Sequence, residues 1–289
     1  MATTFSSCRR HVLLLLQLLV VGASVGLSES ALNKTTITSK ELQMIHARLR
    51  SLNKPPLKSI QSPDGDIIDC VPFHLQPAFD DPMLKRLIKP LDPPKMVKNH
   101  EYANDTVADD LFQLWRSSGE TCPEGTVAIR RTKEEDIIRA GSVEMFGKKP
   151  VEYAEITNIK GSSHEHSVGI VRGDEIYGAR ATLNVWNPQL RVSYEFSLAQ
   201  LWLTAGSYSN TIEVGWMVYP KLFGDRLTRI FIFWTSDRYK NGCYNLLCSG
   251  FVQTSRKIAV GAAISPVSTY NGRQNTILLT VLKRDDGNW

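Results

Sequence analysis

The amino-acid sequence predicts a mainly β protein whose second half forms an antiparallel β-sandwich or barrel. First, that half contains short runs rich in Val, Ile, Phe, Tyr and Trp, several with alternating apolar and polar residues. Second, turn residues rather than helical segments separate these runs, which argues against a parallel sheet. Third, the first half is rich in proline and carries one strong helix pattern. The predicted strands are residues 179–186, 193–203, 211–219, 227–235, 250–253, 258–264 and 275–283.

The chain begins with the features of a secretory signal peptide. Arg9 and Arg10 form a positively charged segment, and residues 12–21 are apolar except for Gln17. This apolar stretch is shorter than the ~20 residues that a membrane span needs, which favours a cleaved signal over a membrane anchor. We therefore expect a signal peptide at residues 1–28. The mature protein is then secreted, extracellular and free of the membrane.

A single amphipathic helix is predicted directly after this leader. Thr38 and Glu41 have the spacing of a capping box, and Pro55 and Pro56 end the helical pattern. One apolar stripe follows the helical period at Leu42, Ile45, Leu49 and Leu52. A helix of this length is not stable alone, so the stripe must pack against another part of the chain.

The proline-rich residues 57–129 are predicted to be extended, as a strap laid across a neighbouring domain or as a linker. Residues 62–65 have the composition of a turn, and residues 130–139 are charged and compatible with a helix. Residues 141–161 contain Gly147-Lys148-Lys149-Pro150 and are expected to form an exposed connector that proteases can cut.

Four cysteines remain after removal of the leader, and an oxidising compartment allows three ways of pairing them. Cys243 and Cys248 close a small loop easily, which leaves Cys70 and Cys122 for a long-range disulfide. Zinc binding is the alternative, but no pair of Cys or His residues has finger spacing. Asn33 and Asn104 begin N-glycosylation sequons.

Charge and motifs exclude several functional classes. Lys and Arg number 34 against 29 Asp and Glu, an excess that is too small and too dispersed to indicate a nucleic-acid partner. Serine hydrolase, Walker and zinc protease motifs do not occur in the sequence. His164-Glu165-His166 offers two histidines without a clear third ligand. We expect neither a metal nor a cofactor.

Glu213 is the most informative carboxylate. In the strand predicted around it, the period of two places Glu213, Gly215, Met217 and Tyr219 on one face and apolar residues on the other. A glutamate on an ordinary solvent-facing side of a strand is the alternative interpretation, so this pattern alone does not make Glu213 catalytic.

Longer strings carry a resemblance to a known family. Residues 196–202, 210–216, 234–237 and 242–253, in that order, resemble the neprosin family of secreted plant glutamic peptidases. Residues 67–71 and 76–80 are similar to the activation peptide of that family. One departure is Asp81, where the family more often has His.

The resemblance implies a zymogen of an endopeptidase, with a prodomain and linker at residues 29–150 and a peptidase domain at 151–289. In the family, two glutamates activate a water molecule against a peptide carbonyl, often after proline, and Glu213 corresponds to the first. Two close carboxylates cannot both ionise cheaply, so acid activity is expected. The implied partners are a peptide or protein substrate and the chain's own activation peptide. The alternation of side chains along the predicted strands places Gln200, Trp202 and Tyr219 as candidate walls of the cleft that holds the substrate.

A second departure lies at residues 285–289, beyond which the family places its second glutamate. The sequence therefore predicts an incomplete sandwich with open strand edges, poor solubility and an inactive, shortened form. Three residues are candidates for a substitute acid: Glu165, Glu195 and Asp237. The alternative function is that of a non-catalytic secreted β-sandwich protein that binds a partner.

Overall fold

The computed structural model describes residues 37–84, 112–149, 165–173, 175–206, 210–237, 239–284, 287 and 289. The signal peptide, Asn33, Asn104, His164 and residues 150–161 of the predicted connector lie outside these described residues. The chain divides into two units, Met1–Leu42 and Gln43–Trp289. Within the described part, no helix is long and apolar enough to cross a membrane.

The predicted helix is present as α2, Ser39–Leu52. Its capping box forms as expected: the Glu41 amide donates to Thr38 Oγ1 at 3.2 Å, and the Thr38 amide donates to Glu41 Oε2 at 2.8 Å. From Gln43 onward, Ile45 and Leu52 are buried in a cluster with Phe146 and with Ile137 of helix α3, Glu134–Ala140. Packing of this apolar stripe is what stabilises α2.

The proline-rich region folds into an antiparallel sheet, which corrects the expectation of an extended strap. Its strands, in the order β1-β2-β4, are β1 (Lys58–Gln61), β2 (Ile67–Pro72) and β4 (Thr126–Arg130). The turn at residues 62–65 joins β1 to β2, so the turn prediction was correct but the flanking strands were missed. The hydrophobic core of this sheet includes Ala259 and Ala262, from the other half of the chain. The two halves of the chain therefore share this core.

The short elements of this region also contact the second half. Strand β3 (Phe112–Gln113) pairs with β10 (Ile264–Ser265). Among the described residues, short 3₁₀ turns connect the larger elements: η1 (Phe73–Leu75), η2 (Pro77–Asp80) and η4 (Leu114–Arg116).

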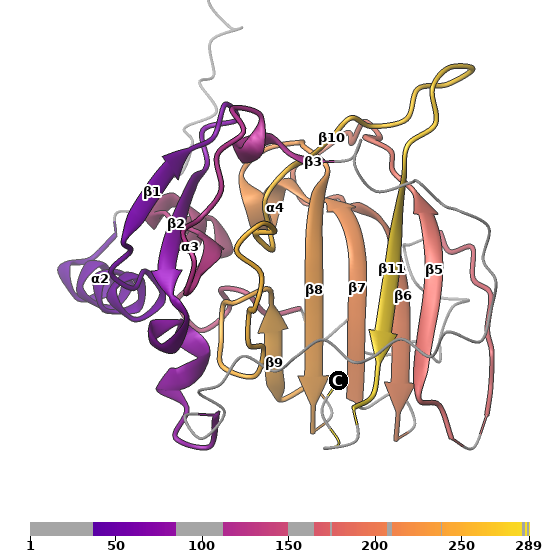
Figure 1. The fold of residues 1–289 in the computed structure, drawn as a ribbon. Coiled ribbons are helices and arrows are strands. Elements are labelled where there is room, and N and C mark those ends of the chain that lie inside the picture. Colours follow the sequence, from indigo (N-terminus) through magenta and orange to yellow (C-terminus); the bar gives the residue numbers. More distant parts are fainter. Residues whose placement is uncertain are drawn as a thin grey trace, which may run out of the picture. The chain divides into compact units, whose positions relative to one another are not determined.

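The second half is built on a four-stranded antiparallel meander. Its strands follow chain order: β6 (Ser197–Ala205), β7 (Asn210–Val218), β8 (Arg229–Ser236) and β9 (Asn241–Tyr244), with the short helix α4 (Pro220–Phe223) between β7 and β8. Strand β5 (Gly178–Asn184) pairs with β11 (Thr276–Leu282) as a separate two-stranded sheet. These strands run alongside the meander in Figure 1.

The two sheets pack on each other through one face of the meander. Ala199, Trp216 and Ile230 belong to an apolar cluster with Leu183 of β5 and Ile277 of β11. The opposite face of the meander carries Glu213, because successive side chains along a strand point to opposite faces of the sheet. The predicted class, mainly β with antiparallel sheets and a small helix in the N-terminal region, is confirmed.

Two predicted strands are wrong. Residues 250–253 are irregular, and of 258–264 only the last residue enters a strand, β10. Glycines break both runs: Gly250 and Gly261 have φ values of 123° and 90°, which favour glycine and interrupt a ladder. Asn271, between β10 and β11, has φ 55°, and the two strands pair with other strands and not with each other. Strand β9 was not predicted.

Candidate active site

Glu213 lies in the middle of β7, directly opposite Trp202 of β6 and Phe233 of β8. Directly opposed residues of antiparallel strands project to the same face, so the carboxylate stands between two aromatic side chains. Glu213 is fully buried, with 0% exposure. Buried carboxylates need a charge partner, and the ordinary solvent-facing interpretation does not apply.

The partner is Lys149, which lies 64 residues earlier in the chain. Its Nζ donates to both carboxylate oxygens of Glu213, at 2.6 and 2.5 Å. The same nitrogen is 4.3 Å from the centre of the Phe233 ring and 5.9 Å from those of Trp202 and Tyr244. We call the four residues Glu213, Phe233, Trp202 and Tyr244 the ammonium cage. They combine a carboxylate with the faces of aromatic rings, both of which attract a cation.

Burial lowers the pKa of the Lys149 ammonium, and the charge and hydrogen bonds of Glu213 offset part of that effect. Thr211, two residues before Glu213 on the same face, donates its hydroxyl to Glu213 Oε1 at 3.3 Å. Tyr239 stacks on Phe233, with ring centres 6.3 Å apart. Burial and the nearby Glu213 charge raise the pKa of the Tyr239 phenol to about 12, against a hydrogen bond with Thr211.

The three predicted wall residues lie on this side of the meander. Trp202 is part of the ammonium cage, and Gln200 lies opposite Gly215. The indole Nε1 of Trp202 and Oε1 of Gln200 are buried without a hydrogen-bond partner among the described residues. Tyr219 follows β7 and packs edge-on against Phe196, with ring centres 5.5 Å apart. Tyr219 therefore contributes to the apolar cluster beside the cage.

Gly215 has a specific reason to be glycine. An added Cβ would lie 2.0 Å from the carbonyl oxygen of Ala199 on the neighbouring strand β6. The two backbones approach this closely beside Glu213, a recognised use of glycine within strands.

Sequence reasoning missed the lysine because it assigned Lys149 to an exposed connector. The structure corrects this: Phe146 and Gly147 are buried, and the Gly147 carbonyl accepts a hydrogen bond from the Tyr244 amide at 2.8 Å. Only the doubled lysine next to a proline could have drawn attention to the position, and Lys148 beside it is exposed. Phe233, Tyr244 and Tyr239 appeared only as ordinary strand and turn residues.

The candidate substitute acids contact other residues. Glu195 Oε2 accepts hydrogen bonds from the Arg191 and Val192 amides, while Asp237 lies 3.6 Å from Lys240. Glu165 is exposed. None of these contacts involves Glu213. Among the described residues, no group of three or more His, Cys, Asp or Glu side chains could hold a metal.

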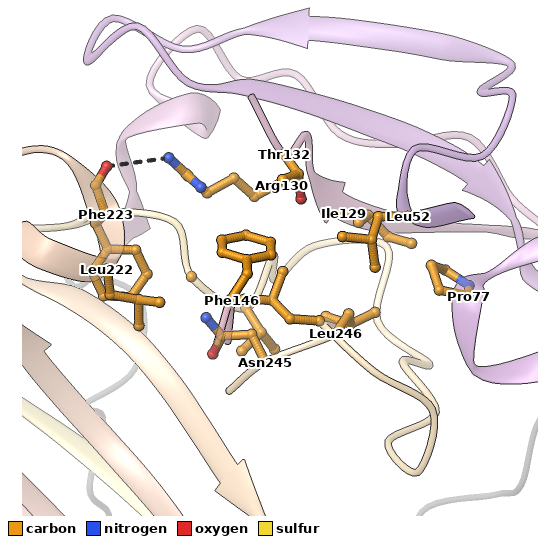
Figure 2. A pocket seen from close by; sticks show the side chains of 13 residues that line it. Leu52, Pro77, Ile129, Arg130, Thr132, Phe146, Leu222, Phe223, Asn245 and Leu246 are labelled. Carbon is orange, nitrogen blue, oxygen red and sulfur yellow. Dashed lines mark hydrogen bonds between the residues drawn. The ribbon is translucent and has the colours of Figure 1, made fainter. Parts of the chain in front are cut away.

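A mostly apolar pocket lies away from Glu213. Figure 2 shows Phe146 between Arg130, which donates to the Phe223 carbonyl at 3.5 Å, and Leu246. The lining comes from Leu52, Pro77, Ile129, Arg130, Thr132, Phe146, Leu222, Phe223, Asn245, Leu246, Leu247, Val260 and Gly261. Its walls are mostly apolar and lack a carboxylate, so the pocket offers a packing space rather than an acid–base site.

A buried charge network lies elsewhere, at the β1–β2 turn. Arg229 of β8 is fully buried and pairs with Asp66 at 2.5 Å and with Asp225 at 2.5 Å. Asp66 also accepts from Arg130 Nε at 2.9 Å, and Arg130 contacts Asp136 at 3.2 Å. These carboxylates raise the pKa of Arg229 against the effect of its burial. The network joins the N-terminal sheet to β8.

Both disulfides that the sequence favoured are present: Cys70–Cys122 and Cys243–Cys248. The first closes a separation of 52 residues, and its sulfurs lie in the core of the N-terminal sheet. The second ties β9 to the segment that follows it, next to Tyr244 of the ammonium cage.

Comparison with known families agrees with this organisation. Residues 59–170 match the family model described as Neprosin activation peptide, and residues 193–289 match that described as Neprosin. Together the matches cover well over half of the chain, in the expected order. Lys149 falls in the first matched region, and Glu213 falls in the second. The chain belongs to the neprosin family and combines an activation-peptide region with a peptidase region.

Proposed function

We propose that this protein is a secreted, latent glutamic peptidase in which Glu213 is the catalytic carboxylate. The observation that supports this most directly is the burial of Glu213 on a strand face, with its charge met by a lysine from the activation-peptide region. A carboxylate with a purely structural role can pair with any nearby cation and does not need one from a segment that is later removed. Such pairing is what a latent acid–base group requires, because the partner leaves when the segment does.

In the proposed reaction, water attacks the carbonyl carbon of a peptide bond and passes a proton to Glu213. The amide nitrogen then takes that proton from Glu213, its bond to the carbonyl carbon breaks, and it leaves as an amine. In the family, a second carboxylic acid polarises the carbonyl, and sharing of one proton by the pair gives acid activity. Thr211, which donates to Glu213, can keep the carboxylate oriented during these steps.

The remaining features of the proposal come from the sequence and the family. They are a signal peptide at residues 1–28, a prodomain and linker at 29–150, a peptidase domain at 151–289, glycans at Asn33 and Asn104, and cleavage after proline. Two disulfides in the structure suit a protein that matures in an oxidising compartment.

The test is hydrolysis of a proline-containing peptide by acid-treated protein from a secretory host. Cleavage by the wild type that falls at least 100-fold in Glu213→Gln, the usual scale for an acid–base group, would support the proposal and contradict the inactive form that the sequence predicted. Glu124→Gln, a change of the same kind at an exposed site, serves as the matched control and should leave activity unchanged. Equal cleavage by all three proteins would remove Glu213 from the mechanism.

One observation favours the alternative function, a non-catalytic binding protein. Among the described residues, the side chains that contact the Glu213 carboxylate are Lys149 and Thr211, and neither is an acid. A protein of this second kind would show no cleavage by either the wild type or Glu213→Gln. It would retain the fold and the ammonium cage.

A further inference from the structure

The geometry points to a binding site for primary alkylammonium groups: the ammonium cage, with Lys149 as its built-in occupant. We infer that Lys149 thereby acts as the latch that keeps Glu213 inactive, a consequence that rests on the proposed function. Once Lys149 is absent, the cage should accept the ammonium end of a free alkylamine or of a lysine side chain.

The cage supplies every contact that a buried ammonium needs. A lysine is rarely buried unless it is paired, because removal of the charge from water is costly. Here the cost is offset by two hydrogen bonds to Glu213 and by the Phe233 ring at 4.3 Å. The compact ammonium fits between the rings, whereas the wider planar guanidinium of arginine requires more space.

Lys149 can act as a latch because its ammonium group contacts the carboxylate oxygens of Glu213. Its Nζ contacts both oxygens of Glu213, so a water molecule cannot use the same lone pairs to lose its proton. The backbone that delivers the side chain is anchored as well. Phe146 is buried against Ile45 and Ile137, and the Gly147 carbonyl is bonded to the Tyr244 amide. Such anchoring keeps the local concentration of the ammonium high.

The position of Lys149 in the chain has a further consequence. Lys149 precedes residues 150–161, the remainder of the predicted connector, and its anchors at Phe146 and Gly147 lie on the same side of any cut made there. Cleavage within the connector therefore leaves the ammonium in its cage. Activity requires that the cut activation-peptide region also dissociates, so a nicked but undissociated protein should remain latent.

Ligand binding can be tested independently of catalysis. Lys149→Ala empties the cage, and Lys148→Ala removes an exposed lysine one residue away as the matched control. At ten times its Kd, n-butylammonium should raise the Tm of Lys149→Ala by about 3–6 °C. The wild type and Lys148→Ala should not respond, nor should Lys149→Ala treated with uncharged n-butanol. Equal responses of Lys149→Ala and Lys148→Ala would refute the site. If Lys149→Ala does not fold, Lys149→Met keeps the volume and tests the latch by activity.

Activity assays then separate the latch from the proposed function. We expect intact Lys149→Ala to cleave peptide at acid pH without removal of its activation-peptide region, and n-butylammonium to inhibit it. Cleavage that n-butylammonium does not inhibit refutes the latch and leaves the function standing. Saturable binding of n-butylammonium without any cleavage refutes the function and retains the ammonium site. Full activity of nicked, undissociated wild type also contradicts the latch.

Discussion

Asp66 is the residue whose removal should most weaken the junction between the N-terminal sheet and β8. It lies in the turn after β1 and is 3% exposed. One carboxylate oxygen accepts from Arg130 at 2.9 Å, and the other accepts from the fully buried Arg229 at 2.5 Å. Asp66→Asn retains the shape of the side chain but removes its charge, so two guanidinium groups lose a shared partner.

The size of the effect follows from what the arginines keep. Arg229 retains Asp225 and the Gly261 carbonyl, and Arg130 retains Asp136. Breaking a buried pair costs about 3–5 kcal/mol, and these retained partners place Asp66→Asn at the lower end, ~3 kcal/mol. In a protein of this size, that corresponds to a fall in Tm of roughly 6–12 °C.

The stability difference between wild type and Asp66→Asn should depend on pH in a defined direction. Burial raises the pKa of Asp66, but the charges and hydrogen bonds of Arg130 and Arg229 outweigh it, and the net shift is downward from 3.8. An acid whose pKa is lowered by folding contributes its full stabilisation of the folded state at pH values above its unfolded pKa. That contribution is lost as the pH falls through the pKa of the folded state. The difference between wild type and Asp66→Asn should therefore be full at neutral pH and close below pH 3.8.

Urea unfolding followed by tryptophan fluorescence measures this difference at each pH. Asp80→Asn is the matched control, because Asp80 pairs with Lys54 at 2.7 Å but is 52% exposed. Exposed pairs contribute at most ~1 kcal/mol. A gap for Asp66→Asn that stays constant from neutral pH to below 3.8, or one no larger than that of Asp80→Asn, would refute the reasoning.

Three further changes have defined outcomes. Gly215→Ala places a Cβ 2.0 Å from a β6 carbonyl oxygen, so we expect a loss of about 1–3 kcal/mol in urea unfolding, and an unchanged midpoint would contradict the close approach. Glu213→Gln should lower the Tyr239 pKa from about 12, without returning it to 10.0 because burial remains, as measured by ultraviolet titration. Replacing Cys70 and Cys122 by Ala should cost about 4 kcal/mol, from the 52-residue separation, and a loss under half of that would argue against loop closure as the source.

Local patterns account for the parts of the fold that the sequence predicted. The capping box at Thr38 and Glu41 involves residues three apart, and the strands from β5 to β8 follow side-chain alternation over a few residues. The cysteine pairing could be predicted because the loop between Cys243 and Cys248 is short, which leaves the other two cysteines for each other. Predictions failed where long-range contacts decide the conformation: Gln76 and Gln253, 177 residues apart, hold an irregular segment with hydrogen bonds of 2.7 and 3.0 Å.

The residues of the candidate site also separate into those that local patterns predict and those that depend on long-range contacts. Strand phase placed Glu213, Gln200 and Trp202 on one face because a strand has a strict period of two. It could not find Lys149, since the lysine reaches the site from a segment without a regular period. Nor could it predict burial of Glu213, because burial depends on the segment that covers the strand and not on the strand itself.

Among the described residues, ion pairs at two places join the activation-peptide region to the peptidase region, and the two places differ in their response to acid. At Asp66, acid removes the negative charge of the pair, so the contact with Arg229 weakens as the pH falls below 3.8. At Lys149, acid leaves the ammonium charged, so a falling pH does not remove the positive charge of this contact. Access to Glu213 therefore depends on departure of the segment that carries Lys149, and not on loss of the lysine charge.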